Sequence, residues 1–193
     1  MIEQPSTQNW RKFGPPQRYA SVSFDDFKTY TPALEDAVDK VFAFPYSGLA
    51  TDTYEIGARG FDNLLIVGTP GTGKTMLAAM WLRDRMVDDE EQGQFLTSYQ
   101  LGDAALDSPE VKRASTVQNL VLDDIAADSR DLDAVVRILD QRLARELRTV
   151  LTSNARPDEL KEIYGPRGFS RIFCNALVVL LNGTDYRLKQ LKD

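Results

Sequence analysis

Short apolar blocks and longer amphipathic stretches alternate along most of this chain. The apolar blocks have the length of strands and are bounded by turn residues, which is typical of strands buried on both faces of a sheet. They predict five strands, at residues 62–67, 94–99, 119–122, 149–152 and 176–181. The intervening sequence predicts helices at residues 32–44, 74–87, 131–148, 157–164 and 168–175, with residues 101–113 left open.

Strands that alternate with helices indicate a parallel sheet with helices on both faces. The expected fold class is therefore α/β, with three layers built around a five-stranded parallel sheet. In such a sheet the loops after the strands gather at one edge, where ligands bind. Residues 1–20 are polar and contain prolines, so we expect an N-terminal arm there and a single core domain over residues 21–193.

The first predicted strand leads into a glycine-rich loop. Glycines let the N–H groups of such a loop point at phosphate oxygens, and the N-terminus of the next helix faces the same place. Lys74 is expected to reach the β- and γ-phosphates of a nucleoside triphosphate, and Thr75 to place its hydroxyl on Mg²⁺. The order of strand, loop and helix favours this interpretation over a surface turn. The loop fits the pattern G-x-x-x-x-G-K-[ST] with the residues Gly68, Thr69, Pro70, Gly71, Thr72, Gly73, Lys74 and Thr75.

The composition excludes several classes of chemistry. The chain has no histidine and one cysteine, Cys174, which rules out histidine-dependent triads, histidine metal sites, an internal disulfide and cysteine-rich zinc sites. No stretch is long and apolar enough to cross a membrane, and the N-terminus lacks signal-peptide features, so we expect a cytoplasmic protein with no membrane partner. The net charge of −6 argues against coating DNA by bulk electrostatics.

Three arginines recur along the helix predicted at residues 131–148. Arg142, Arg145 and Arg148 would share one face of it, opposite an apolar stripe. A solvated face that pairs with Glu146 is favoured over a DNA contact.

Acidic and polar residues follow the third and fourth predicted strands. Asp123 is expected to hold Mg²⁺ directly or through water, and Asp124 to polarise an attacking water as general base. A strand capped by a turn-forming aspartate pair is the alternative. Asn154, at the end of the fourth strand, would lie between the γ-phosphate and that water. Further along, Arg167 and Arg171 are either surface residues or include an arginine finger that neutralises charge in the transition state.

In this order, these stretches resemble the AAA+ ATPases, and within them the DnaC/IstB-like clade of bacterial and phage helicase loaders and transposition ATPases. The resemblance covers most of the chain from about Arg18 onward. It rests on the segments PPQRY, SFDDF, GTPGTGKT, LVLDDI, QRL, LTSN, SRIF and GTDYR.

The resemblance implies a P-loop fold with ATP and Mg²⁺ as ligands and ATP hydrolysis as the activity. It implies Lys74 and Thr75 on the nucleotide and metal, Asp123 and Asp124 as the Walker B acids, and Asn154 as sensor 1. It also implies that Arg171 is a finger supplied to the neighbouring subunit of a homo-oligomer, whose active sites then lie between subunits. A replicative helicase is the expected partner, with single-stranded DNA as a further ligand.

The chain departs from the pattern of this clade in two ways: only a short arm precedes the core, and the interval between Tyr99 and Asn119 is short. The clade carries an extra helix in that interval, implicated in assembly and DNA contact. No C-terminal helical lid is expected after the fifth strand, and its absence is normal for this clade. For the adenine pocket, residues 19–27 are the best candidates, although Phe24 and Phe27 are expected in the core.

The function expected is an ATP-driven assembly switch in DNA replication, as a helicase loader. Two alternatives stay open: a transposition helper ATPase that binds target DNA, and a nucleotide-binding scaffold with little hydrolysis. A small-molecule kinase is least favoured, because it would need a substrate lid.

Overall fold

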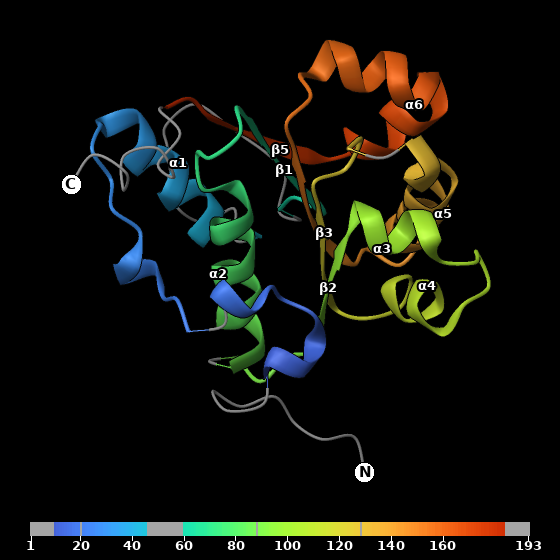
Figure 1. The fold of residues 1–193 in the computed structure, drawn as a ribbon, viewed down its shortest axis with the longest axis horizontal. Helices are drawn as coiled ribbons and strands as arrows, with labels where there is room; N and C mark the ends of the chain where they lie inside the picture. Colours follow the sequence, from blue (N-terminus) through green and yellow to red (C-terminus); the bar gives the residue numbers. More distant parts are fainter. Residues whose placement is uncertain (1–9, 20, 46–59, 88, 128, 184–193) are drawn as a thin grey trace.

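The computed structural model describes residues 10–19, 21–45, 60–87, 89–127 and 129–183. Its centre is a five-stranded sheet in the order β2-β3-β4-β1-β5, and every pair of neighbouring strands is parallel (Figure 1). This confirms the expected sheet. The strands are β1 (Asn63–Gly68), β2 (Gly93–Thr97), β3 (Asn119–Asp123), β4 (Arg148–Ser153) and β5 (Ala176–Leu181).

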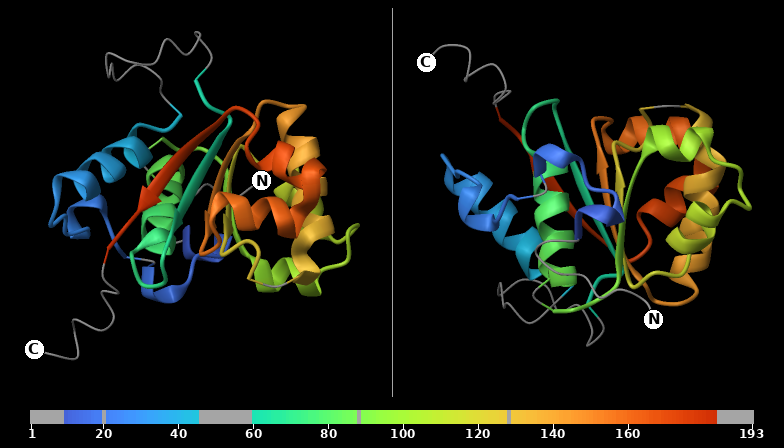
Figure 2. Two further views of the ribbon diagram at one scale, coloured as in Figure 1. Left: turned by 90° about the horizontal axis from the view of Figure 1, so that it is seen from above. Right: turned by 60° about the horizontal axis from the view of Figure 1, so that its bottom comes forward.

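Helices cover both faces of the sheet, which gives the three expected layers (Figure 2). The protein has a hydrophobic core on each face of the sheet, and alternate side chains of β1 belong to each of them. Leu64 and Ile66 lie in the first core, and Leu65 and Val67 lie in the second. The first core is covered by α1 (Pro32–Ala43) and α2 (Lys74–Val87). The second is covered by α3 (Ser98–Asp103), α4 (Pro109–Ala114), α5 (Leu132–Leu143) and α6 (Pro157–Ile172).

The second strand is shorter than the sequence predicts. It ends at Thr97, because the Thr97 hydroxyl accepts a hydrogen bond from the Gln100 N–H and caps α3. Tyr99, expected in the strand, therefore lies in α3. The interval left open in the sequence forms α4, where Ser108 caps the helix and Pro109 takes its first position.

The helix predicted at residues 131–148 also ends early. It stops at Leu143, and Arg148 already belongs to β4, so Arg142, Arg145 and Arg148 do not share a helix face. The prediction of a solvated arginine face is wrong for Arg142, whose guanidinium is fully buried. Its N–H groups donate to the Thr149 hydroxyl and to four main-chain carbonyls, those of Ala114, Val117, Gln118 and Arg148.

The two short helices predicted after β4 are present as the two halves of α6, which meet at a kink. Its kink is at Gly165, whose φ of 65° and ψ of −178° lie outside the helical region. A glycine suits this position because side chains disfavour a positive φ. Pro166 follows at once, so the second half of the helix, which carries Arg167 and Arg171, starts in a new direction.

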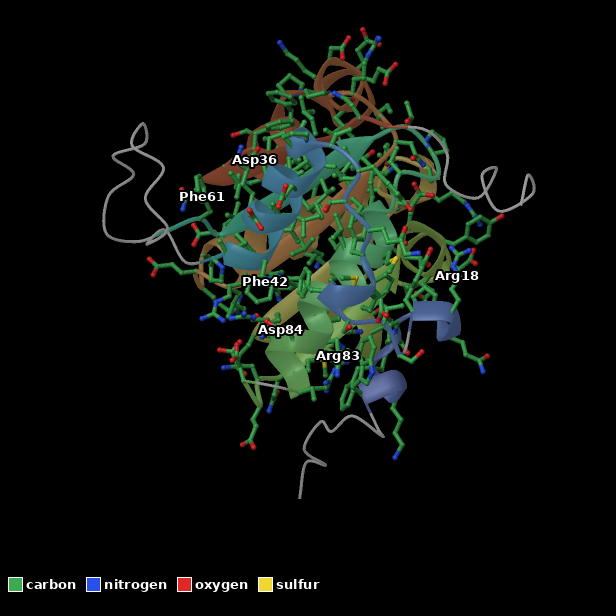
Figure 3. All side chains as sticks on the ribbon, turned by 90° about the vertical axis from the view of Figure 1, so that its left-hand side faces the viewer. Arg18, Asp36, Phe42, Phe61, Arg83 and Asp84 are labelled. Carbon is green, nitrogen blue, oxygen red and sulfur yellow. The ribbon has the colours of Figure 1, made fainter. Side chains whose placement is uncertain are left out.

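The N-terminal segment packs along the α1–α2 side of the molecule. Three short 3-10 turns, η1 (Trp10–Phe13), η2 (Gln17–Tyr19) and η3 (Phe24–Asp26), follow one another there, and Trp10 is fully buried. Figure 3 shows this side, with Phe42 near the end of α1. The rings of Phe24 and Phe42 pack edge to face, with their centroids 4.7 Å apart.

The domain boundary expected near residue 20 and the absence of a helical lid stay predictions. In the described part of the chain, no helix has the length and apolar character needed to span a bilayer.

Candidate functional site: a phosphate-binding loop beside two acidic strand ends

The glycine-rich loop connects β1 with α2 at the carboxyl edge of the sheet. Gly71 and Gly73 have φ values of 80° and 98°, the left-handed conformations that curl the loop. Gly73 also lies against the Phe27 ring, since a Cβ at Gly73 would come within 2.7 Å of it. Any larger residue at position 73 would therefore displace Phe27 or the loop.

The Lys74 side chain lies inside this loop. Lys74 is 6 % exposed, and its ammonium donates to the carbonyls of Gly68 and Thr69 at 2.8 Å each. A third bond, of 2.7 Å, goes to the Asn154 Oδ1 at the end of β4. The ammonium is thus held at the mouth of the loop, where the N-terminus of α2 also points.

Asp123 ends β3 next to the loop. Its Oδ1 accepts a 2.7 Å hydrogen bond from the Thr152 hydroxyl of β4, and the Thr75 hydroxyl lies near the same carboxylate. Burial raises the pKa of Asp123 above its ordinary value, although both hydroxyls and the Lys74 charge oppose the shift. A positive ion beside this carboxylate would reverse the effect of burial.

Asp124 and Asn154 meet in front of Lys74. Asp124 has a φ of 60°, and its N–H donates to the Thr152 hydroxyl at 2.8 Å. The Asn154 Nδ2 donates to Asp124 Oδ1 at 2.7 Å while its Oδ1 accepts from Lys74. One amide side chain therefore joins the loop lysine to the second acid.

The arrangement fits Mg²⁺ bound together with a phosphate. Thr75 and Asp123 bring a hydroxyl and a carboxylate to one point, and oxygen ligands of this kind suit Mg²⁺. Magnesium in nucleotide sites takes only one or two protein carboxylates, with water and phosphate as its other ligands. The described residues accordingly contain no group of three or more acidic, histidine or cysteine side chains that would hold a metal by itself.

Arg171 lies at the opposite edge of the sheet. Its carbonyl accepts a 3.1 Å hydrogen bond from Asn63, the first residue of β1, whereas the loop begins at Gly68, the last. Five residue steps along β1 separate these two ends by about 16 Å. The guanidinium of Arg171 pairs with Asp140 of α5, and Arg167 pairs with the other carboxylate oxygen at 2.6 Å.

Asp140 therefore holds both arginines of the second half of α6. Although burial raises its pKa, hydrogen bonds from Arg167 and Arg171 and their charges lower the pKa of Asp140 overall. The structure thus brings six predicted residues together at one edge and places Arg171 apart from them. The six are Gly68, Lys74, Thr75, Asp123, Asp124 and Asn154.

Two residues of this arrangement were not anticipated. Thr152 contacts both acids, and its hydroxyl gives little signal in the sequence, because β4 also carries Thr149 and Ser153. Asp140 gives no signal, because its partners lie 27 and 31 residues away. Phe24 and Phe27 pack against the α1–α2 core as expected.

Sequence comparison gives limited information. The family model of magnesium chelatase subunit ChlI matches residues 47–97, which include the glycine-rich loop and α2. The chain matches no curated protein.

The fold resembles solved structures of replication proteins. A DnaC helicase loader has a TM-score of 0.68 at 19 % identity, over 86 % of this chain and 99 % of its own. A primosome component from Streptococcus pyogenes scores 0.72 at 22 % identity, over 89 % and 91 %. DnaA from Aquifex aeolicus, bound to AMPPCP, scores 0.66 at 17 % identity, over 93 % and 55 %. This chain therefore has the fold of the P-loop AAA+ proteins, with helicase loaders and DnaA among its structural neighbours.

Proposed function

We propose that this protein binds and hydrolyses ATP and acts as an assembly switch in DNA replication, as the loader of a replicative helicase. The observation that carries the ATPase proposal is the position of Asn154, which hydrogen-bonds both Lys74 and Asp124 at 2.7 Å. A γ-phosphate held by the lysine and a water activated by the acid would then lie on either side of one amide.

Each side chain has a distinct task in this proposal. The loop N–H groups and Lys74 bind the phosphates, and Asp124 accepts the proton of the attacking water. Asn154 orients that water between acid and phosphate. Thr75 and Asp123 would hold Mg²⁺, which neutralises charge on the phosphate oxygens when it is bound. Phe27 lies against the loop at Gly73, and residues 19–27 are the proposed neighbourhood of the adenine.

Arg171 is proposed to complete the site of an adjacent subunit. It lies at the far edge of its own sheet, about 16 Å from its own loop by strand length. Arg171 therefore has a use in hydrolysis only if a second subunit presents its loop to it. Such head-to-tail contacts build rings or helical filaments, so nucleotide would favour assembly and hydrolysis would release it.

The helicase as partner is inferred from the neighbours named above, a DnaC helicase loader and a primosome component. Single-stranded DNA is a further proposed ligand. The net charge of −6 disfavours the alternative of a transposition helper that coats duplex DNA.

The test compares the wild type with Asp124→Asn. Binding of a fluorescent ATP analogue should be unchanged in the variant, because Lys74 and the loop are intact, while turnover should fall about a hundredfold or more. Asp158→Asn, at the start of α6, is the matched control and should keep full turnover. Equal turnover in the wild type and Asp124→Asn would contradict the ATPase proposal.

The same proteins test the partner. Asp124→Asn with ATP should retain the cognate replicative helicase on a column, and Lys74→Ala should not. If neither the wild type nor Asp124→Asn retains the helicase with or without ATP, the loader proposal fails. ATP-dependent binding of duplex DNA in place of helicase would support the transposition alternative.

A further inference from the structure

A buried carboxylate links the three helices α3, α5 and α6. Asp131, at the start of α5, is fully buried, and its two oxygens accept hydrogen bonds from the hydroxyls of Ser98 and Tyr164. Ser98 begins α3 and Tyr164 belongs to α6. Burial and the Asp131 charge raise the pKa of Tyr164, so its hydroxyl keeps the proton that it donates.

The same hydroxyl also reaches the loop that follows β3. The Ala126 N–H donates to the Tyr164 hydroxyl at 3.1 Å, and Ala126 lies two residues after Asp124. Tyr164 is thus an acceptor for this loop and a donor to Asp131. Loss of the Tyr164 hydroxyl oxygen would therefore disturb both the loop after β3 and Asp131 at the start of α5.

The loop needs this support because its backbone is strained. Asp124 and Ala126 have φ values of 60° and 67°, a region that residues with side chains rarely adopt. Bonds from neighbouring groups hold it there. The Asp124 and Ile125 N–H groups donate to Thr152, and the Ser153 hydroxyl donates to the Ile125 carbonyl. Tyr164 supplies a further anchor, at Ala126.

Tyr164 also immediately precedes the kink of α6. Gly165 has a φ of 65°, and the half-helix beyond it carries Arg167 and Arg171. A shift of the loop after β3 would therefore pull on the residue at the hinge between the two halves. Tyr164 thus bonds to that loop and lies next to this hinge.

We propose that Tyr164 and Asp131 are positioning residues that fix the Asp124 loop and couple it to the arginine-bearing half of α6. This inference rests on the proposed ATPase function. Under that function, whether a subunit holds ATP or ADP would change the position of Arg167 and Arg171, which the same subunit presents to its neighbour. The coupling runs through one tyrosine hydroxyl, so removal of that oxygen should break it and leave the loop lysine untouched.

The experiment uses Tyr164→Phe, which removes only the hydroxyl. Loss of this anchor should lower kcat for ATP about tenfold, with KM and nucleotide affinity within about twofold of the wild type. Ser115→Ala is the matched control, because it removes another buried hydroxyl, which donates to the Val111 carbonyl at 2.9 Å away from the site. The control should lose stability and keep kcat.

A purely structural role would give the opposite pattern. Tyr164→Phe would then unfold at lower denaturant concentration and keep the kcat of the wild type in its folded fraction. Such a result would overturn the proposal. Ser98→Ala, which removes the other donor to Asp131, should lower kcat in the same direction by a smaller factor, and it serves if Tyr164→Phe does not fold.

Hydrogen exchange separates this inference from the ATPase proposal. Binding of a non-hydrolysable ATP analogue should change the exchange rates of the Ala126 amide and of the amides of residues 167–172 in the wild type. Only the second change should disappear in Tyr164→Phe. If the wild type shows no turnover, the ATPase proposal is contradicted, but the exchange measurement can still be made. If the amides of residues 167–172 respond to the analogue in Tyr164→Phe as they do in the wild type, the coupling proposal is wrong.

Discussion

At the scale of single residues, Arg142 shows how a charge can serve the fold. Its guanidinium lies in the interior and donates to one hydroxyl and four main-chain carbonyls. Those carbonyls lie at the end of α4, in the turn before β3 and at the first residue of β4. Burial lowers the pKa of Arg142 to about 9, which leaves it protonated at neutral pH. Arg142 therefore links the end of α4, the turn before β3 and the start of β4.

We expect Arg142→Met to be strongly destabilising. The variant leaves buried carbonyls without donors, which costs about 3 kcal/mol or more in the free energy of unfolding. Urea denaturation at neutral pH measures the loss. Arg145→Met is the control, since Arg145 is exposed and its change should stay within about 0.5 kcal/mol. Equal stability of the two variants would show that the network contributes little.

The sequence alone predicts some of these residues and not others. Lys74, Asp123 and Asn154 were predicted because each ends or follows a strand within a short local pattern. Arg142 was misplaced because its spacing from Arg145 and Arg148 fits a helix that in fact ends at Leu143. Residues such as Asp140 and Tyr164 act through partners distant in sequence, and only the packing of helices on the sheet shows them.

At the scale of elements, the packing of α5 on α6 depends in part on one ion-paired carboxylate. Asp140 pairs with Arg167 and Arg171, which lie on the far side of the α6 kink. These contacts hold the second half of α6 against α5. The finger proposed above is therefore positioned by a charge on its own subunit.

The lowered pKa of Asp140 predicts a dependence on pH. A carboxylate whose folded pKa is lowered contributes stability that is present above its unfolded pKa of about 3.9 and is lost as pH falls through the folded pKa. Asp140→Asn should therefore unfold more easily than the wild type between pH 5 and pH 8, and the difference should shrink below about pH 4. Urea denaturation across this range measures it, because urea adds no ionic strength; a difference that persists at low pH would mean that the ion pairs are not its source.

At the scale of the whole molecule, the two ends of the sheet carry different parts of the proposed chemistry. Lys74, Asp124 and Asn154 meet at the carboxyl edge, and Arg171 lies at the other. One subunit cannot join them, because its own strands keep them apart. A site made from two copies is the arrangement in which all four residues act together.

Mixed subunits test this arrangement. Arg171→Ala and Asp124→Asn should each be nearly inactive, but an equal mixture should recover up to about a quarter of wild-type turnover, since random head-to-tail pairing joins an intact acid to an intact arginine in that share of sites. Arg171→Ala mixed with the double variant Asp124→Asn, Arg171→Ala should recover nothing. Without recovery in the first mixture, and with both proteins folded, the result would argue for Arg167 as the finger or for no finger at all.

The burial of Trp10 gives the molecule a built-in optical probe. The chain has two tryptophans, Trp10 in the N-terminal segment and Trp81 in α2, and both are fully shielded from solvent. Their emission should be blue-shifted in the native protein and should move to the red as either indole meets water. A variant that keeps only Trp10 would report release of the N-terminal segment alone, so fluorescence can follow that movement in solution without an added dye.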